Sequence, residues 1–193
     1  MRTDIKRADR RITKTKRSIR DAFFELNAER GFAAITVSAL CERANINRNT
    51  FYYHYADVQA LFDELSGELV REMEAVYRAE LLPLERSRAI CRIFSEHSQL
   101  VGILNDGYAG AILLWKLTRA AGKYVKRDLR IQYPYISASE LDIITAYVLH
   151  GSMKAILHWM EEASDISLED MAALLNAIME RGTSALKLRG KGG

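Results

Sequence analysis

The chain has 193 residues and a net charge of +3, and 49% of its residues are hydrophobic while only two are proline. This composition excludes an intrinsically disordered chain and allows either one domain or a small domain beside a larger one. Cys41 and Cys91 lie far from any metal-ligand spacing, which argues against a disulfide framework and a zinc site. We expect both cysteines to be buried, and we predict no metal and no cofactor.

The N-terminal end is the basic part of the chain. Residues 1–55 carry twelve basic and six acidic side chains, a net charge of +6 against +3 for the whole chain. This asymmetry is typical of a module that binds DNA phosphates, although a solvated charged tail has the same composition. We interpret residues 1–11 as a basic arm, which either contacts the minor groove or only supplies counter-charge. The segment lacks the apolar stretch of a signal peptide, so we expect a cytoplasmic protein.

An amphipathic helix is predicted to follow the arm. Its apolar residues recur at helical spacing and are Ile12, Ile19, Ala22, Phe23 and Leu26. Gly31 is suited to end this helix, because glycine adopts the left-handed conformation of many helix C-termini without steric cost.

Residues 36–55 predict two short helices joined by a tight turn. Thr36 can cap the first helix and Asn47 the second, because their side-chain oxygens accept hydrogen bonds from free backbone N–H groups. Asn45, between the helices, is the residue most suited to a left-handed turn. The apolar stripe of the first helix consists of Val37, Leu40, Cys41 and Ala44.

The second of these helices has a face suited to DNA, opposite the apolar residues Phe51 and Tyr55. Arginine and asparagine match the donors and acceptors of base edges in the major groove, and hydroxyl or ring N–H groups reach phosphate oxygens. We therefore predict base contacts from Arg48 and Asn49. The other candidate DNA-binding residues are Thr36, Asn47, Thr50, Tyr52, Tyr53 and His54.

A long fourth helix is predicted to begin after Asp57 and to end before Pro83, which can start the next helix. The remaining helices are expected at about 84–96, 98–105, 109–132, 139–162 and 167–187. The predicted fold is all-α, with about nine helices. A three-helix helix-turn-helix domain over residues 12–56 is joined, through the fourth helix, to a larger helical domain over residues 57–188. Residues 189–193 are expected to form a disordered tail.

Several short motifs recur in a fixed order along residues 31–61. They are Gly31-Phe32, Thr36-Val37, Ala44-Asn45-Ile46, the run Thr50–Tyr55 and the stretch Asp57–Leu61. Over roughly residues 12–65 the chain thereby resembles the TetR family of transcriptional repressors. The family usually has glycine where this chain has Asn45, and a phosphate-contacting lysine where it has Val58.

The last two predicted helices are more apolar than a surface helix needs to be. They form either the centre of a monomeric body or a four-helix interface across a two-fold axis. The resemblance implies the interface, because TetR-like proteins dimerise through their last two helices. The candidate interface residues are Tyr147, Gly151, Ile156, Met171, Leu175, Ile178 and Gly182.

The resemblance also implies that the larger domain encloses a pocket, and that a small-molecule effector bound there releases DNA. Aromatic and histidine side chains of the middle helices can line such a pocket, although packing in the core is the commoner role of these residue types. The candidates are Phe94, His97, Tyr108, Trp115, Tyr147, His150 and Trp159.

We therefore expect a homodimeric, sequence-specific DNA-binding repressor that a small molecule releases from an inverted-repeat operator. The alternative is a TetR-like interaction protein or coactivator that has lost operator binding, which Val58 in place of lysine slightly favours. We predict no enzymatic activity, because the four histidines are isolated in sequence and no nucleophile, phosphate-loop or metalloprotease motif is present.

Overall fold

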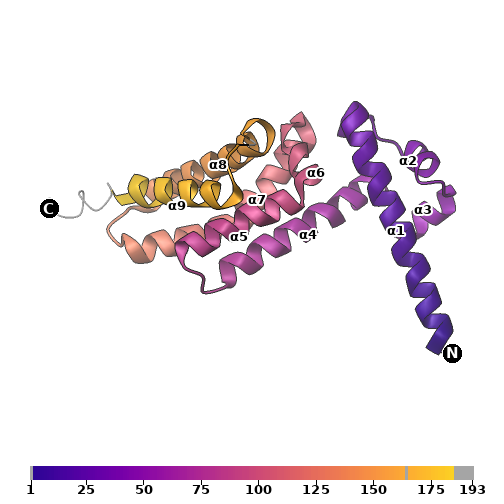
Figure 1. Cartoon of the computed structure of the whole chain (residues 1–193), viewed down its shortest axis with the longest axis horizontal. Helices are drawn as coiled ribbons and strands as arrows, with labels where there is room; N and C mark the ends of the chain where they lie inside the picture. Colours follow the sequence, from indigo (N-terminus) through magenta and orange to yellow (C-terminus); the bar gives the residue numbers. More distant parts are fainter. Residues whose placement is uncertain (1, 164, 185–193) are drawn as a thin grey trace.

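The computed structural model describes residues 2–163 and 165–184, which form nine α-helices and two short 3₁₀-helices and contain no strand (Figure 1). The prediction of an all-α fold is confirmed. The elements are α1 (Arg2–Arg30), η1 (Phe32–Ala34), α2 (Val37–Arg43), α3 (Arg48–His54), α4 (Val58–Arg78), α5 (Pro83–Glu96), α6 (Ser98–Val101), η2 (Gly102–Asn105), α7 (Gly107–Gln132), α8 (Ala138–Glu162) and α9 (Leu168–Ser184). None of the helices within these ranges is both long and apolar enough to cross a bilayer.

The N-terminal half of α1 projects away from the rest of the molecule (Figure 1). The backbone of α1 is helical from Arg2 onward, so the segment that we interpreted as a separate arm continues the first helix. Ile12 is exposed, contrary to our expectation, because it precedes the part of α1 that packs on α2 and α4. Ile19 and Phe23, further along the same helix, are fully buried as predicted.

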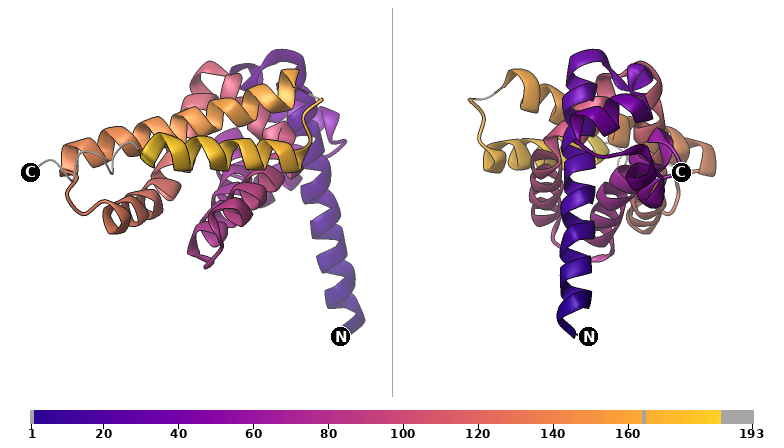
Figure 2. Two further views of the ribbon diagram at one scale, coloured as in Figure 1. Left: turned by 60° about the vertical axis from the view of Figure 1, so that its left-hand side comes forward. Right: turned by 90° about the vertical axis from the view of Figure 1, so that its right-hand side faces the viewer.

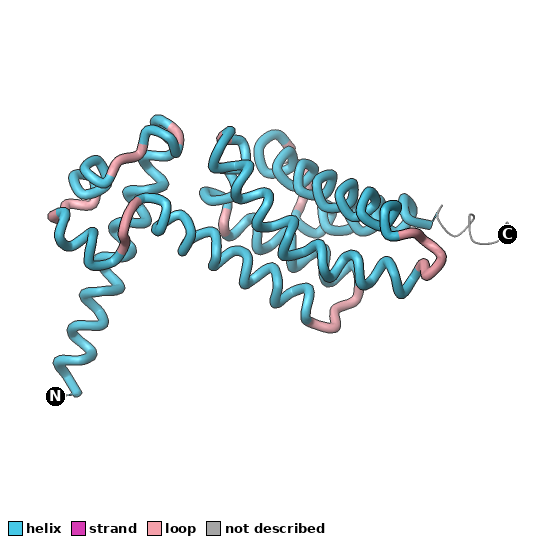
Figure 3. Tube along the Cα trace, turned by 180° about the vertical axis from the view of Figure 1, so that it is seen from behind, coloured by secondary structure: helices cyan, strands magenta, loops and turns pink. Residues whose placement is uncertain are grey.

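The fourth helix belongs to both halves of the molecule (Figure 3). The Asp57 carboxylate caps it, accepting a hydrogen bond from the backbone N–H of Ala60 at 2.7 Å. Near its start, the ring of Phe62 packs on Phe32, with centroids 5.1 Å apart. Further along, Met73 and Tyr77 are buried in the larger domain. A continuous helix therefore connects the two halves without a flexible linker.

The larger domain is a bundle of the last five long helices (Figure 2). Helix α7 packs on α4 and α8, while α5 packs on α4 and α9. Pro83 is the first residue of α5, where its missing N–H removes no hydrogen bond. The segment expected to form one helix at 98–105 is α6 followed directly by η2. Cys41 and Cys91 are buried free thiols, as predicted. The predicted disordered tail, residues 189–193, lies outside the described residues.

Candidate nucleic-acid interface and effector cavity

The turn between α2 and α3 has the geometry that the sequence predicted. Asn45 adopts a left-handed conformation with φ of 51°, and the N–H of Ile46 donates to the carbonyl of Cys41 at 2.9 Å. This conformation turns the chain within a few residues, so α3 crosses the end of α2. The fully buried ring of Phe51 fixes α3 on the core of the small domain.

Helix α2 is fastened to α1 by one arginine. Both terminal nitrogens of Arg43 donate to Glu29, at 2.7 and 2.9 Å, and Nη1 also donates to Glu25 at 3.0 Å. The hydrogen bond from Arg43 lowers the pKa of Glu29. Because two carboxylates neutralise Arg43, this base positions α2 and contributes little to the surplus charge of the N-terminal segment.

Two of the candidate DNA-binding residues are also helix caps. The Thr36 hydroxyl accepts from the N–H of Ala39 at 3.2 Å. The Asn47 side-chain oxygen accepts from the N–H and the hydroxyl of Thr50, at 2.7 and 2.9 Å. Both caps were predicted. The oxygen atoms of Thr36 and Asn47 are used in capping the helices. The amide NH₂ of Asn47 and the hydroxyl hydrogen of Thr36 remain as donors.

The outer face of α3 carries the side chains expected there. Tyr52 is 55% exposed and Tyr53 is 76% exposed, and Arg48 and Asn49 are exposed beside them. Nη2 of Arg48 donates to the Ser38 hydroxyl at 3.0 Å, which steers the guanidinium along the outside of α2. No acidic residue occurs between Asn47 and Tyr55. The face therefore offers donors to an anionic surface.

The end of α3 is joined to α1 and α4 through Glu64. Its carboxylate accepts from the Tyr55 hydroxyl and from Nζ of Lys16, both at 2.6 Å. Burial and the bond to Glu64 raise the pKa of Tyr55, so this phenol stays protonated. Burial and the charge of Lys16 lower the pKa of His54, which is therefore a neutral hydrogen-bonding group at neutral pH.

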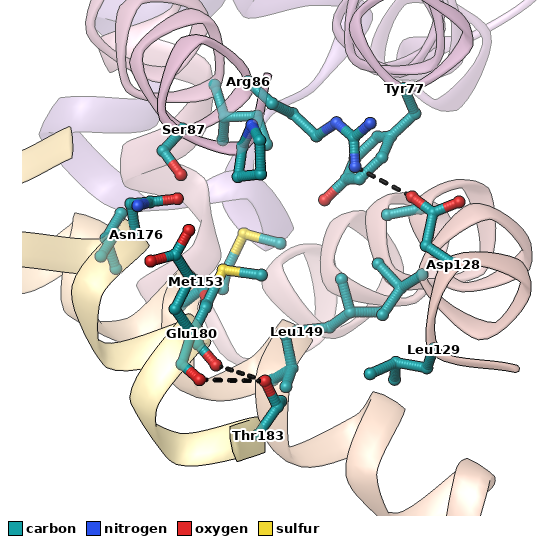
Figure 4. Close-up of a pocket in the computed structure, with 18 of the residues that line it drawn as sticks. Tyr77, Arg86, Ser87, Asp128, Leu129, Leu149, Met153, Asn176, Glu180 and Thr183 are labelled. Carbon is teal, nitrogen blue, oxygen red and sulfur yellow. Dashed lines mark hydrogen bonds and ion pairs between the residues drawn. The ribbon is translucent and has the colours of Figure 1, made fainter. Parts of the chain in front are cut away.

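A cavity of about 610 Å³ lies between α4, α5, α7, α8 and α9 (Figure 4). Its apolar wall includes Phe94, Leu149 and Met153. Its polar wall contains an ion pair between Arg86 on α5 and Asp128 on α7, with 2.9 Å between Nη1 and Oδ2. Its size is within the range of small-molecule sites, roughly 300–1,000 Å³.

Residues 19–65 match the family model described as bacterial regulatory proteins, tetR family. The match covers the helix-turn-helix region, so this part of the chain is similar to the DNA-binding domain of TetR-family regulators. In addition, 61 residues are 38% identical to the helix-turn-helix transcriptional regulator YxbF of Bacillus subtilis strain 168, over 31% of this chain and 16% of YxbF. The regulator YhgD of the same organism is 23% identical over 190 residues, which cover 88% of this chain and 97% of YhgD.

The fold of most of the chain also matches solved structures. The crystal structure of a TetR transcriptional regulator from Streptococcus agalactiae 2603V superposes with a TM-score of 0.66 and 24% sequence identity, covering 89% of this chain and 97% of that one. The resemblance expected from the motifs at residues 31–61 is thus confirmed over residues 19–65 by the family model, and the solved structure supports the overall fold.

Only Phe94 of the seven candidate effector residues lines this cavity. Tyr108, Trp115 and Tyr147 are exposed. Nε2 of His97 lies 2.9 Å from the Glu72 carboxylate, and Nε1 of Trp159 donates to the carbonyl of Ile166 at 2.8 Å. His150 lines a separate hollow of about 100 Å³. Helical spacing identified aromatic residues, but it does not determine which side of each helix faces the cavity.

The candidate interface residues divide into two groups. Ile156, Met171 and Leu175 are 2%, 3% and 5% exposed in the single chain, because α8 and α9 pack on α5 and on each other. The exposed group is Tyr147, Gly151, Ile178 and Gly182. Ile143 and Leu174 extend this exposed apolar surface, and both were missed.

Proposed function

We propose that this regulator is a homodimeric repressor in the cytoplasm, that it binds an inverted-repeat operator with the α3 helix of each protomer, and that a small molecule in the 610 Å³ cavity releases it. Arg48 and Asn49 contact base edges in the major groove. Residues that contact phosphates or position the helix are Thr36, Asn47, Thr50, Tyr52, Tyr53 and His54.

The single observation that carries the DNA-binding proposal is the outer face of α3. Arg48, Asn49 and two exposed tyrosines share it, without an acidic neighbour on the helix. Bidentate arginine and asparagine side chains distinguish base pairs in the major groove. Buried Phe51 and the Asn45 turn hold the helix rigidly, which is what a preformed recognition surface requires.

The dimer proposal is supported by the exposed apolar surface of α8 and α9. Ile143 and Tyr147 lie one helical turn apart on α8, and Leu174 and Ile178 lie one turn apart on α9. A Cβ atom added at Gly151 or Gly182 meets nothing within 4 Å in the protomer, so internal packing does not require these glycines. Small residues on an apolar helix face allow a second helix to approach closely.

The effector proposal is supported by the helices that line the cavity. Tyr77 at the end of α4 and Asp128 near the end of α7 both line it. The opposite ends of these two helices lie at the small domain. Helix α4 begins at its cap Asp57, shortly after α3, and Asp106 at the start of α7 accepts a hydrogen bond from the N–H of Phe32 in η1. A ligand that fits only one arrangement of α4 and α7 would therefore shift the equilibrium between DNA-binding and released forms.

Operator binding is tested by nuclease footprinting of the full chain on DNA from upstream of its own gene. We expect a footprint with two half-sites about 34–36 Å apart, the separation that two symmetric recognition helices need. The coactivator alternative is favoured by one observation, the partly buried Val58 at the position where the family has lysine. It predicts no protected DNA at any site, even at low salt.

A further inference from the structure

The polar wall of the cavity is built from two tyrosines and an ion pair. Tyr77 is 8% exposed and Tyr133 is 1% exposed, and both line the cavity with Arg86 and Asp128. The guanidinium of Arg86 lies over the Tyr77 ring, 5.8 Å from its centroid. Figure 4 shows the Tyr77 hydroxyl pointing into the cavity beside this ion pair.

Several hydrogen-bonding atoms of this wall have no partner. Within the part of the chain that the structure describes, the Tyr133 hydroxyl and Nε of Arg86 are buried without a hydrogen bond. The hydroxyl of Tyr77 faces the cavity near these atoms (Figure 4). Burial raises the pKa of Tyr77 to about 12, so its hydroxyl is a donor at neutral pH. Buried donors without acceptors are unfavourable, and a ligand that brings an acceptor relieves this.

Two arginines share one carboxylate beside these donors. Asp128 accepts from Nη1 of Arg86 at 2.9 Å and from Nε and Nη2 of Arg127 at 3.0 and 2.8 Å. One carboxylate therefore serves two guanidinium groups. The other carboxylate at the cavity, that of Glu180, is on α9 and is exposed, so solvent screens it.

We propose that the cavity binds an amphipathic monocarboxylate, whose carboxylate accepts from the Tyr77 hydroxyl and from Arg86. Its apolar chain lies along Phe94, Leu149 and Met153. This proposal rests on the proposed effector role of the same cavity. A neutral alcohol of equal length fills the apolar part but brings no charged acceptor to the unpaired Nε of Arg86. A lipophilic cation places like charge beside Arg86.

The test compares three molecules with the same chain and different heads: dodecanoate, dodecanol and dodecyltrimethylammonium. Each is titrated calorimetrically, below its micelle concentration, into the full chain. We expect dodecanoate to bind about tenfold more tightly than dodecanol, the size of one charge-assisted hydrogen bond, and the cation to bind most weakly. Tyr77→Phe and Arg86→Lys each remove most of this preference. Tyr108→Phe, the same change at an exposed tyrosine outside the cavity, leaves it unchanged.

A Glu180→Gln variant adds a second comparison. Removing that carboxylate should leave dodecanoate binding unchanged or tighter, and it should weaken the binding of the cation. The proposal is overturned if dodecanoate does not bind, if dodecanol or the cation binds as tightly, or if dodecanoate binds Tyr77→Phe and Arg86→Lys as well as the parent chain. Operator release is measured separately. If a molecule without a carboxylate releases the operator, and Tyr77→Phe or Arg86→Lys weakens that release, the cavity is the effector site but its ligand is not a carboxylate. If dodecanoate binds without releasing the operator, the carboxylate ligand class is supported and the effector role of the cavity is rejected.

Discussion

The Asp106 carboxylate accepts a hydrogen bond from the backbone N–H of Phe32, with 3.0 Å between Oδ2 and the nitrogen. The other oxygen caps α7, accepting from the N–H of Ala109 at 3.4 Å. One side chain thus ties the small domain to the start of a helix whose far end lines the cavity. The adjacent Gly31 has φ of 75°, and a Cβ atom there would lie 3.3 Å from Oδ2, so a glycine lets the two domains meet.

Replacing this carboxylate should loosen the connection. Asp106→Ala is expected to destabilise the chain by about 1 kcal/mol through loss of the α7 cap. It should also reduce the effect of an effector on operator affinity, because movement of α7 no longer reaches η1. Urea unfolding measures the first effect, and operator affinity with and without effector measures the second. Asp106→Asn, which keeps one acceptor oxygen, should give intermediate values. If Asp106→Ala responds to an effector as strongly as the parent chain, Asp106 does not transmit the effector signal from α7 to η1.

The left-handed turn gives a prediction with a matched pair of variants. Asn45→Ala should lower the free energy of unfolding by about 1 kcal/mol, because alanine tolerates a positive φ less well than asparagine. Asn45→Gly should leave stability within about 1 kcal/mol of the parent chain, since glycine adopts this conformation freely. Denaturant unfolding of the three proteins checks the order. Equal stability of the alanine and glycine variants would contradict the assigned role of the turn.

Glu64 should make the small domain sensitive to acid. Burial raises the pKa of this carboxyl, but the hydrogen bonds from Lys16 and Tyr55 outweigh burial and hold it below its usual 4.5. Its stabilising contribution is therefore present above about pH 4.5 and is lost as the pH falls through the lower, folded-state pKa. Glu64→Gln should be less stable than the parent chain at neutral pH, and the two should converge in acid. Urea midpoints across this range test the prediction, which fails if the difference is independent of pH.

The exposed surface of α8 and α9 predicts how the dimer can be broken. Ile178→Asp places a charge in the centre of the proposed interface and should give a monomer by sedimentation, with greatly weakened operator binding. Ile131→Asp is a control, because Ile131 is also an exposed isoleucine, 75% exposed near the end of α7 against 53% for Ile178. It should remain a dimer. If the Ile178→Asp variant is still a dimer at micromolar concentration, the dimer interface does not include this part of α9.

Local signals in the sequence predicted the helices well. Caps at Thr36, Asn47 and Asp57 fixed three helix starts, and Pro83 fixed a fourth. Each of these signals acts between residues close in the chain. The outward direction of Arg48 and Tyr52 followed from helical spacing around the buried Phe51.

The cavity was not predictable in the same way. Arg86 and Asp128 are 42 positions apart, and only the packing of α5 against α7 brings them together. Helical spacing shows which residues share a face of α9, but not that α5 covers the face with Met171 and Leu175. For the same reason, the charge count of residues 1–55 does not reveal that Glu25 and Glu29 on α1 hold Arg43.

We propose that α3 reads a DNA sequence through its exposed face. The most direct measurement is the affinity of the full chain and of Arg48→Ala for a set of operators that differ at single base pairs. We predict that Arg48→Ala loses about 1–3 kcal/mol of discrimination at one position in each half-site and retains it elsewhere, whereas Arg92→Ala, at an exposed arginine on α5, behaves like the parent chain. An unchanged preference at every position after Arg48→Ala would contradict the account.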